Sequence, residues 1–484
     1  MKNTVVTNVE ITSRHKVLTL NGTRPRYDLR GIKETYPNIT ALKIQKGVES
    51  IKMLNKTFPN IRKVTSTSPE FLSGEMLVQA IRDGKKIKSK ILLNAFCRED
   101  SETLDLSGIS SIENMALDGC MSTEVANDKS LVWLYQDSLT GSAFDAEQID
   151  GDGPIFFGSY IVGFKKDTYL FTLTDSTKKI IWTSKCKPIP MLVVNDYKLI
   201  KVFFDDIPDD VQVCDTLRIE DSRNFKNQIK NFDVKFPAAH IIITPKNKAL
   251  KTENDSICSA DGSTVYTSAW FLTGKAIIPN GVKLVEGIGY PSENITSLEI
   301  PSSVESMDPY CIWNADRLSL VKCDNENLPE GCINAVLVTA EGLGLGEDTD
   351  DNVIEVITEN AHVFLPRYMS KKNANLLDKK GVTDMASITD AYKYASSDNV
   401  KYDVIRKTYE FSKDKKLEKI LKDEAVSILL VYIRNGRIQA ALDFVGLNLF
   451  TPDALNDMLS DIGKDTQITA ANYNKYCDGL KKLS

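Results

Sequence analysis

The chain has 484 residues, of which 42% are hydrophobic and 26% charged, and its formal net charge is −6. This length exceeds one ordinary compact core, so two or three domains or one extended repeat array are expected. The mild acidity argues against a nucleic-acid-binding surface as the main role, and no apolar run approaches the roughly 18 residues that cross a bilayer.

The nine cysteines are scattered singly, without a Cys-x-x-Cys pair, and residues 1–10 carry no signal-peptide hydrophobic segment. An odd, unpaired set is typical of a reducing cytoplasm, where cysteines act as small core residues. Only three histidines are present. We therefore predict a cytoplasmic protein with no metal and no cofactor.

In chain order, residues 1–25 are expected to form one or two short strands that cap a repeat array. The repeat, which spans 26–345, first shows as Tyr36-Pro-Asn-Ile-Thr-Ala-Leu42, which recurs 22 positions later as Phe58-Pro-Asn-Ile-Arg-Lys-Val64. Another copy runs from Thr103 to Ile112. Between these copies, Glu75–Arg82 has apolar residues at helical spacing and is predicted to be an inserted helical turn.

The repeat is hard to see in residues 141–260. Short runs rich in Tyr, Phe, Val and Ile predict strands there, including one at Leu199–Phe204. This part is either a degenerate continuation of the repeats or a separate β-rich insert. Continuation is favoured because it needs no additional domain.

The repeat returns at Ala276-Ile-Ile-Pro-Asn-Gly-Val282 and, 22 positions later, at Leu298-Glu-Ile-Pro-Ser-Ser-Val304. Each unit is expected to supply one short strand with inward aliphatic residues, and the proline and the small polar residues after it end the strand. One unit cannot cover its own apolar face, so several must stack.

The phrase Leu298-Glu-Ile-Pro-Ser-Ser-Val-Glu-Ser306 resembles the BspA-like leucine-rich repeat of bacteria and their phages. The resemblance is clearest over 276–323 and extends to 27–64 and 103–120. It implies a strand-bearing solenoid used for protein contacts.

The pattern changes after Gly346. Residues 346–369 are predicted to be a joint, and residues 370–484 a helical domain with helices at 402–411, 417–433 and 438–444. Thr451-Pro452 is a strong helix start, with Thr as N-cap and Pro at the first position. These short paired helices resemble the ankyrin-like tail that follows such repeats in bacterial proteins.

The candidate chemical motifs are weak. Gly342-x-Gly-x-Gly346 has the wrong spacing for a dinucleotide loop and is interpreted as a hinge. Asp348-x-Asp350-x-Asn352 resembles part of a calcium loop but lacks the glycine of the sharp turn, and Asp150-x-Asp152 fails in the same way. No nucleophile elbow or zinc-binding helix motif occurs. The basic runs 85–90 and 413–419 are interpreted as solvated surfaces.

The sequence thus predicts an α+β repeat protein: a leucine-rich-repeat solenoid followed by a small all-α domain. The favoured function is a non-catalytic scaffold for an unidentified protein partner, compatible with host–phage conflict or regulation, with no membrane contact and nucleic acid not expected. Lys43, Arg62 and Glu299 are the predicted partner-binding residues, because each lies between inward-facing aliphatic residues and should point outward. The alternatives are a cell-surface adhesin and an enzyme with its site in 141–260.

Overall fold

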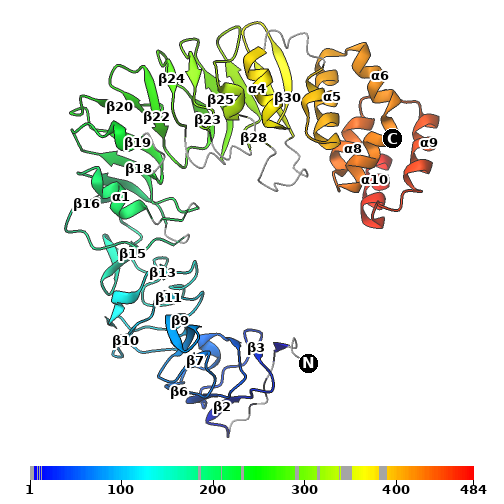
Figure 1. The fold of residues 1–484 in the computed structure, drawn as a ribbon. Coiled ribbons are helices and arrows are strands. Elements are labelled where there is room, and N and C mark those ends of the chain that lie inside the picture. The colour runs from blue at the N-terminus through cyan, green and yellow to red at the C-terminus, as the bar shows by residue number, and fades with distance from the viewer. Residues whose placement is uncertain are drawn as a thin grey trace. The chain divides into compact units, whose positions relative to one another are not determined.

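The computed structural model describes residues 5–483, except for 8, 10, 12–13, 184–186, 206, 209, 230–233, 289–293, 313–316, 337, 340–351 and 381–389. The chain divides into two compact units, residues 1–220 and 221–484. Strands dominate the first unit and the beginning of the second, and helices gather towards the C-terminus (Figure 1).

The first unit begins with rungs that supply strands to two parallel sheets. One sheet contains β2 (Val17–Leu20), β4 (Ala41–Ile44) and β6 (Lys63–Ser66), and the other contains β1 (Val5–Val6), β3 (Arg26–Asp28) and β5 (Ser50–Lys52). Leu18, Leu42 and Val64 are neighbours in register and are all buried. These are the stacked rungs that the 22-residue repeat predicts.

Hydrogen bonds between neighbouring rungs explain the Pro-Asn-Ile phrase of the repeat. The side-chain amide of Asn60 donates to the carbonyl oxygen of Pro37 on the preceding rung, at 2.8 Å. At another turn the rungs approach so closely that a Cβ on Gly22 would lie 1.6 Å from the carbonyl oxygen of Lys46. Backbone contacts therefore fix the repeat period together with the apolar core.

A β-hairpin interrupts the rungs between residues 77 and 94. The sheet that contains it has the order β13-β11-β9-β8-β7 and is formed by β7 (Phe71–Leu72), β8 (Leu77–Asp83), β9 (Lys86–Asn94), β11 (Ser111–Ile112) and β13 (Trp133–Leu134). Strands β8 and β9 are antiparallel, whereas β9, β11 and β13 are parallel. The helix predicted for Glu75–Arg82 is wrong, because these residues pair with β9 along nearly the whole of β8.

The rest of the first unit mixes rungs with an inserted hairpin. Its elements are β10 (Leu104–Asp105), β12 (Val125–Ala126), β14 (Pro154–Phe157), β15 (Tyr160–Phe164), β16 (Leu170–Leu173), β17 (Ile189–Val194), α1 (Lys198–Phe204) and β18 (Cys214–Ile219). Strands β14 and β15 form an antiparallel hairpin, whereas β16, β17 and β18 pair in parallel, as rungs do. The strand predicted for Leu199–Phe204 is wrong: helix α1 buries Leu199, Ile200, Phe203 and Phe204 on one face.

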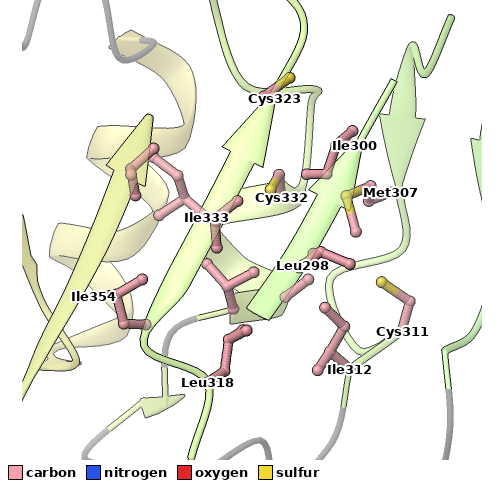
Figure 2. Close-up of a cluster of buried hydrophobic side chains, with 14 of the residues drawn as sticks. Leu298, Ile300, Met307, Cys311, Ile312, Leu318, Cys323, Cys332, Ile333 and Ile354 are labelled. Carbon is pink, nitrogen blue, oxygen red and sulfur yellow. The ribbon is translucent and has the colours of Figure 1, made fainter. Parts of the chain in front are cut away.

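The second unit also contains stacked parallel strands. Its strands are β19 (Ala238–Ile243), β20 (Leu250–Glu253), β21 (Ser256–Ser259), β22 (Thr264–Ser268), β23 (Gly274–Ile277), β24 (Leu284–Val285), β25 (Ile295–Ile300), β26 (Ser306–Met307), β27 (Leu320–Cys323), β28 (Val338–Thr339), β29 (Val353–Ile357), β30 (His362–Pro366) and β31 (Tyr368–Met369). Leu298 lies in register between Ala276 and Val321. Figure 2 shows how Leu298 and Ile300 pack inward with Met307 and other apolar residues of this core.

Helices form the C-terminal part of the second unit. The helices of this unit are α2 (Lys226–Ile229), α3 (Cys332–Val336), α4 (Lys371–Lys380), α5 (Asp398–Ser412), α6 (Lys415–Asp423), α7 (Ala425–Arg434), α8 (Ile438–Val445), α9 (Pro452–Ile462) and α10 (Ala470–Leu483). Thr451 caps α9 as predicted, because its hydroxyl oxygen accepts a hydrogen bond from the amide of Ala454 at 3.3 Å. The helix predicted over 417–433 is divided at Glu424 into α6 and α7.

Candidate functional site

The sheet that includes the inserted hairpin presents apolar side chains to solvent on the side away from its core. Across this sheet Trp133 is aligned with Ser111, Ser111 with Ile91, and Ile91 with Gln79. Because side chains alternate along a strand, the neighbours of these residues on β9, β11 and β13 point inward and are buried: Leu92, Ile112 and Leu134. We call the outward-pointing residues of β8, β9, β11 and β13, with Tyr135 directly after β13, the outer face.

Trp133 and Tyr135 are the prominent aromatic residues of the outer face. They flank the buried Leu134 and remain 43% and 38% exposed. Their rings meet edge to face, with centroids 6.4 Å apart and an interplanar angle of 83°. Val132, just before them, is 61% exposed. Large aromatic side chains that stay exposed on a fixed sheet are characteristic anchors of protein interfaces.

The inserted hairpin extends past the outer face and ends in a basic turn. We call residues 82–88 the hairpin end; it contains Arg82, Lys85, Lys86 and Lys88 against one acid, Asp83. Asp83 pairs with Lys88 at 3.1 Å. Gly84 has φ = +59°, as the first position of a type II′ hairpin turn requires. Within the described part of the chain, Lys85 and Lys86 have no carboxylate within ion-pair distance.

The three predicted partner-binding residues differ in their surroundings. Lys43 is exposed on β4 between Thr19 and Thr65, as expected. Arg62 and Glu299 already have partners: Arg62 pairs with Glu102 and Glu299 pairs with Lys275. Lys43 and Arg62 belong to the first unit and Glu299 to the second.

Sequence reasoning missed the outer face. The run Val132-Trp-Leu-Tyr135 contains the signal, since an inward Leu134 places Trp133 and Tyr135 on the opposite side. The hairpin signal was Asp83-Gly84, a common turn dipeptide. The helical interpretation of Glu75–Arg82 obscured the hairpin signal.

A compact charge cluster joins two rungs of the first unit. Glu102 accepts hydrogen bonds from Arg62 at 2.9 and 3.1 Å and from the amide of Glu99 at 2.7 Å, and the buried Arg98 lies 3.7 Å away. Burial alone would raise the pKa of Glu102, but the hydrogen bonds from Glu99 and Arg62 outweigh it and lower that pKa below its usual value. The cluster therefore holds Glu102 ionised.

A second polar cluster surrounds Asp403 of α5 inside the second unit. Its carboxylate accepts hydrogen bonds from Tyr432 at 2.9 Å and Asn352 at 2.8 Å and lies 2.7 Å from Arg437. Burial and the nearby carboxylate raise the pKa of Tyr432, so its phenol remains a donor. The pocket beside this cluster has a volume of about 400 Å³. Its basic lining residues are balanced by its acidic ones: Arg406, Lys407 and Arg437 against Glu355, Asp403 and Asp443. This balance indicates a stabilising network within the unit.

The other predicted motifs provide no site. Among the described residues, no three His, Cys, Asp or Glu side chains gather as metal ligands, and this includes the Asp150–Asp152 turn. The Gly342–Gly346 hinge and the acidic residues Asp348 and Asp350 lie outside the described residues.

The stacked parallel rungs define a β-solenoid, followed by a helical region at about 398–482. Neither a family model nor a curated protein matches the chain. Three solved structures are similar to it in part. A leucine-rich repeat protein from Eubacterium ventriosum is 15% identical, covering 67% of this chain and 74% of that one, with a TM-score of 0.16.

The second is a leucine-rich cell surface protein from Faecalibacterium prausnitzii, which is 13% identical over 67% of this chain and 75% of that one, with a TM-score of 0.18. The third is the pneumococcal vaccine antigen PcpA, which is 9% identical over 66% and 75%, with a TM-score of 0.16. None of these descriptions mentions BspA or ankyrin repeats, so those finer resemblances stay predictions.

The cytoplasmic location predicted from the sequence is contradicted by these neighbours, which include a cell surface protein and a vaccine antigen. The cysteine argument fails for a physical reason. The eight described cysteines are all unpaired and six of them are buried in the apolar interior. Cysteines that fill an apolar core are placed there by packing, so their unpaired state does not report on the redox compartment. No described helix combines the length and the apolar character that a membrane span requires.

Proposed function

We propose that this protein binds a protein partner through the outer face of its first unit, without catalysis. The observation that carries the proposal is the exposed edge-to-face pair of Trp133 and Tyr135 on a sheet whose opposite side buries Leu92, Ile112 and Leu134. Tryptophan and tyrosine contribute large contact areas and dominate the binding energy of many interfaces.

The sheet supports these two side chains in a way that favours binding. Leu134 is buried between them, and Ile112 beneath the neighbouring strand is buried as well. The backbone of Trp133 donates to Ser110 and that of Tyr135 donates to Ile112. A surface that is already ordered loses little conformational entropy when a partner docks.

The test compares three forms of the full chain: wild type, a Trp133→Ser/Tyr135→Ser variant and a Val202→Ser control. Val202 is 67% exposed on α1, outside the outer face. Each form is immobilised and exposed to extract of the native organism, and retained proteins are quantified by mass spectrometry. We expect a partner that the wild type and the control retain equally and that the double variant loses at least about tenfold. An identical set of proteins retained by all three forms would refute the proposal, provided that circular dichroism shows equal folding.

Lys43, Arg62 and Glu299 remain proposed contacts with a partner. Lys43 is exposed and could contribute at the rim of an interface. Arg62 and Glu299 would have to exchange their ion pairs with Glu102 and Lys275 for contacts with a partner. Exchange of one partly solvated pair for another gives little net energy.

Surface adhesion is the second candidate function, because the neighbours that correct the cellular location include a cell surface protein. The same outer face would serve both functions, and only the place of the partner differs. Protease treatment of intact native cells distinguishes them: degradation of the chain under conditions that spare an internal marker favours adhesion, and protection favours an internal scaffold.

A further inference from the structure

We infer that the partner docks an extended segment in which apolar or aromatic residues are followed by acidic ones. This inference rests on the proposed function and adds the chemistry of the partner. The outer face supplies the apolar half of the surface, and the hairpin end supplies a basic half beside it. The inserted hairpin carries the basic half and part of the outer face, including Ile91, whereas Trp133 and Tyr135 lie on and directly after β13.

The two halves lie within reach of one short segment. Lys86 and Ile91 are five positions apart on β9, which corresponds to about 17 Å of strand. Trp133 is two strands from Ile91, or about 10 Å across the sheet. An extended segment of about seven residues covers roughly 23 Å. Such a segment can contact Trp133 at one end and the hairpin end at the other.

The charge of the hairpin end is opposite to that of the whole chain. Four basic residues and one acid stand in residues 82–88, whereas the chain as a whole carries a net charge of −6. The Arg82 guanidinium is held by the carbonyl oxygens of Pro69 and Lys85, which turns this side chain into part of a fixed positive surface. Lys85 and Lys86 are exposed and form no ion pair among the described residues, because Asp83, which lies opposite Lys86 across the hairpin, pairs with Lys88. An acidic segment would supply the missing countercharges.

A nucleic acid fits this surface less well. Besides its two aromatic residues, the outer face offers aliphatic side chains such as Ile81 and Ile91, and these do not stack on bases. Glu113, directly after β11, brings a negative charge to the same side, so the acidic residues of the segment are expected at the hairpin end and not beside β11. The surface therefore favours an acidic peptide over a polyanion of phosphates.

The experiment uses fluorescein-labelled probes of defined chemistry and the full chain. The probes are a random glutamate–tyrosine copolymer, a lysine–tyrosine copolymer, polyglutamate and single-stranded oligothymidylate. Binding is measured by fluorescence anisotropy. The variants are Lys85→Glu/Lys86→Glu at the hairpin end, Trp133→Ser/Tyr135→Ser on the outer face, and Lys415→Glu/Lys419→Glu as a matched charge control on α6.

We expect the glutamate–tyrosine copolymer to bind best. The Lys85→Glu/Lys86→Glu variant and the Trp133→Ser/Tyr135→Ser variant should each weaken it by about tenfold or more, and the α6 control by less than about twofold. A rise in NaCl from about 0.05 M to about 0.5 M should weaken binding to the wild type strongly and to the hairpin variant little.

The other outcomes separate the two proposals. Binding that needs Trp133 and Tyr135 but ignores the hairpin substitutions overturns the acidic-segment inference and leaves the proposed function standing. Loss caused by the hairpin substitutions alone, with no effect of the aromatic ones, contradicts both. Tighter binding of oligothymidylate or the lysine–tyrosine copolymer, or no copolymer binding at all, also overturns the inference.

Discussion

The Nε atom of Arg62 lies 2.9 Å from Oε1 of Glu102, although 40 positions of the chain separate the two residues. The contact joins the rung of β6 to the segment that follows the inserted hairpin. It also satisfies a guanidinium that, from the sequence alone, is expected to face a partner. A long side chain that points outward from a solenoid can therefore stabilise the fold instead of binding a partner.

The Arg62–Glu102 contact predicts a pH dependence of stability. The pKa of Glu102 is lowered in the folded state, so its contribution is complete above the unfolded value of about 4.5 and is lost as pH falls through the lower folded pKa. Glu102→Gln should remove about 0.5–1 kcal/mol of stability at pH 7, a modest value because solvent partly screens the pair. Urea unfolding at pH 7 and pH 3 measures it: the variant and wild type should differ at pH 7 and converge at pH 3.

The matched control for this experiment is Glu99→Gln, since Glu99 forms no ion pair among the described residues and contributes only its backbone amide and carbonyl to the cluster. Equal pH profiles for wild type and Glu102→Gln would show that the contact does not stabilise the fold.

Truncation of two adjacent residues of β4 should change the stability of the fold by very different amounts. Leu42 is buried between Leu18 and Val64, so Leu42→Ala should cost about 2–5 kcal/mol. Lys43 points to solvent, so Lys43→Ala should change stability by less than about 0.5 kcal/mol. Urea denaturation of both variants checks this. Similar losses for the two substitutions would be incompatible with the alternation of inward and outward residues along the strand.

The buried carboxylate of α5 should be essential to the helical region. Asp403→Ala removes the buried carboxylate that lies 2.7 Å from Arg437 and accepts hydrogen bonds from Tyr432 and Asn352, and should cost about 3–5 kcal/mol. Asp443→Ala, which removes a half-exposed carboxylate 3.7 Å from Arg406, should cost about 1 kcal/mol or less. Thermal unfolding followed by circular dichroism at 222 nm compares the two. A larger loss of stability for Asp443→Ala than for Asp403→Ala would show that the ion pairs at the pocket surface, and not those in the interior, stabilise the helical region.

Thiol reactivity should separate the cysteines by burial. Burial raises the pKa of Cys258 to about 11 and raises those of Cys214, Cys311 and Cys332 as well. Because the thiolate is the reactive form, these four should stay unlabelled by iodoacetamide at pH 8, whereas the partly exposed Cys477 is labelled. Peptide mass spectrometry reads the pattern, and rapid labelling of Cys311 in folded protein would contradict the core described above.

The period of the rungs could be predicted from sequence because the repeated phrase places identical inward residues 22 positions apart. The two wrong segments failed for a shared reason: short apolar runs suit both helix and strand. In Glu75–Arg82 the pairing partner β9 decides for strand, and in Leu199–Phe204 the burial of four residues on one face decides for helix. The local sequence pattern does not show such tertiary effects.

The candidate site was less predictable than the fold. Alternation identifies which residues point outward, and it placed Lys43 correctly. It does not show which outward residues find partners on other rungs, as Arg62 does with Glu102. Trp133 and Tyr135 are recognised as a candidate site only because they lie beside the inserted hairpin. The sequence pattern did not show that this hairpin consists of strands.

The inserted β8–β9 hairpin leaves the parallel register of β9, β11 and β13 undisturbed. Because each rung bonds mainly to the rungs beside it, a longer excursion at one turn does not propagate along the stack. Arms of this kind can be lengthened, shortened or exchanged while the interior stays the same. The architecture thereby allows recognition to diversify in evolution, or by grafting in the laboratory, independently of folding.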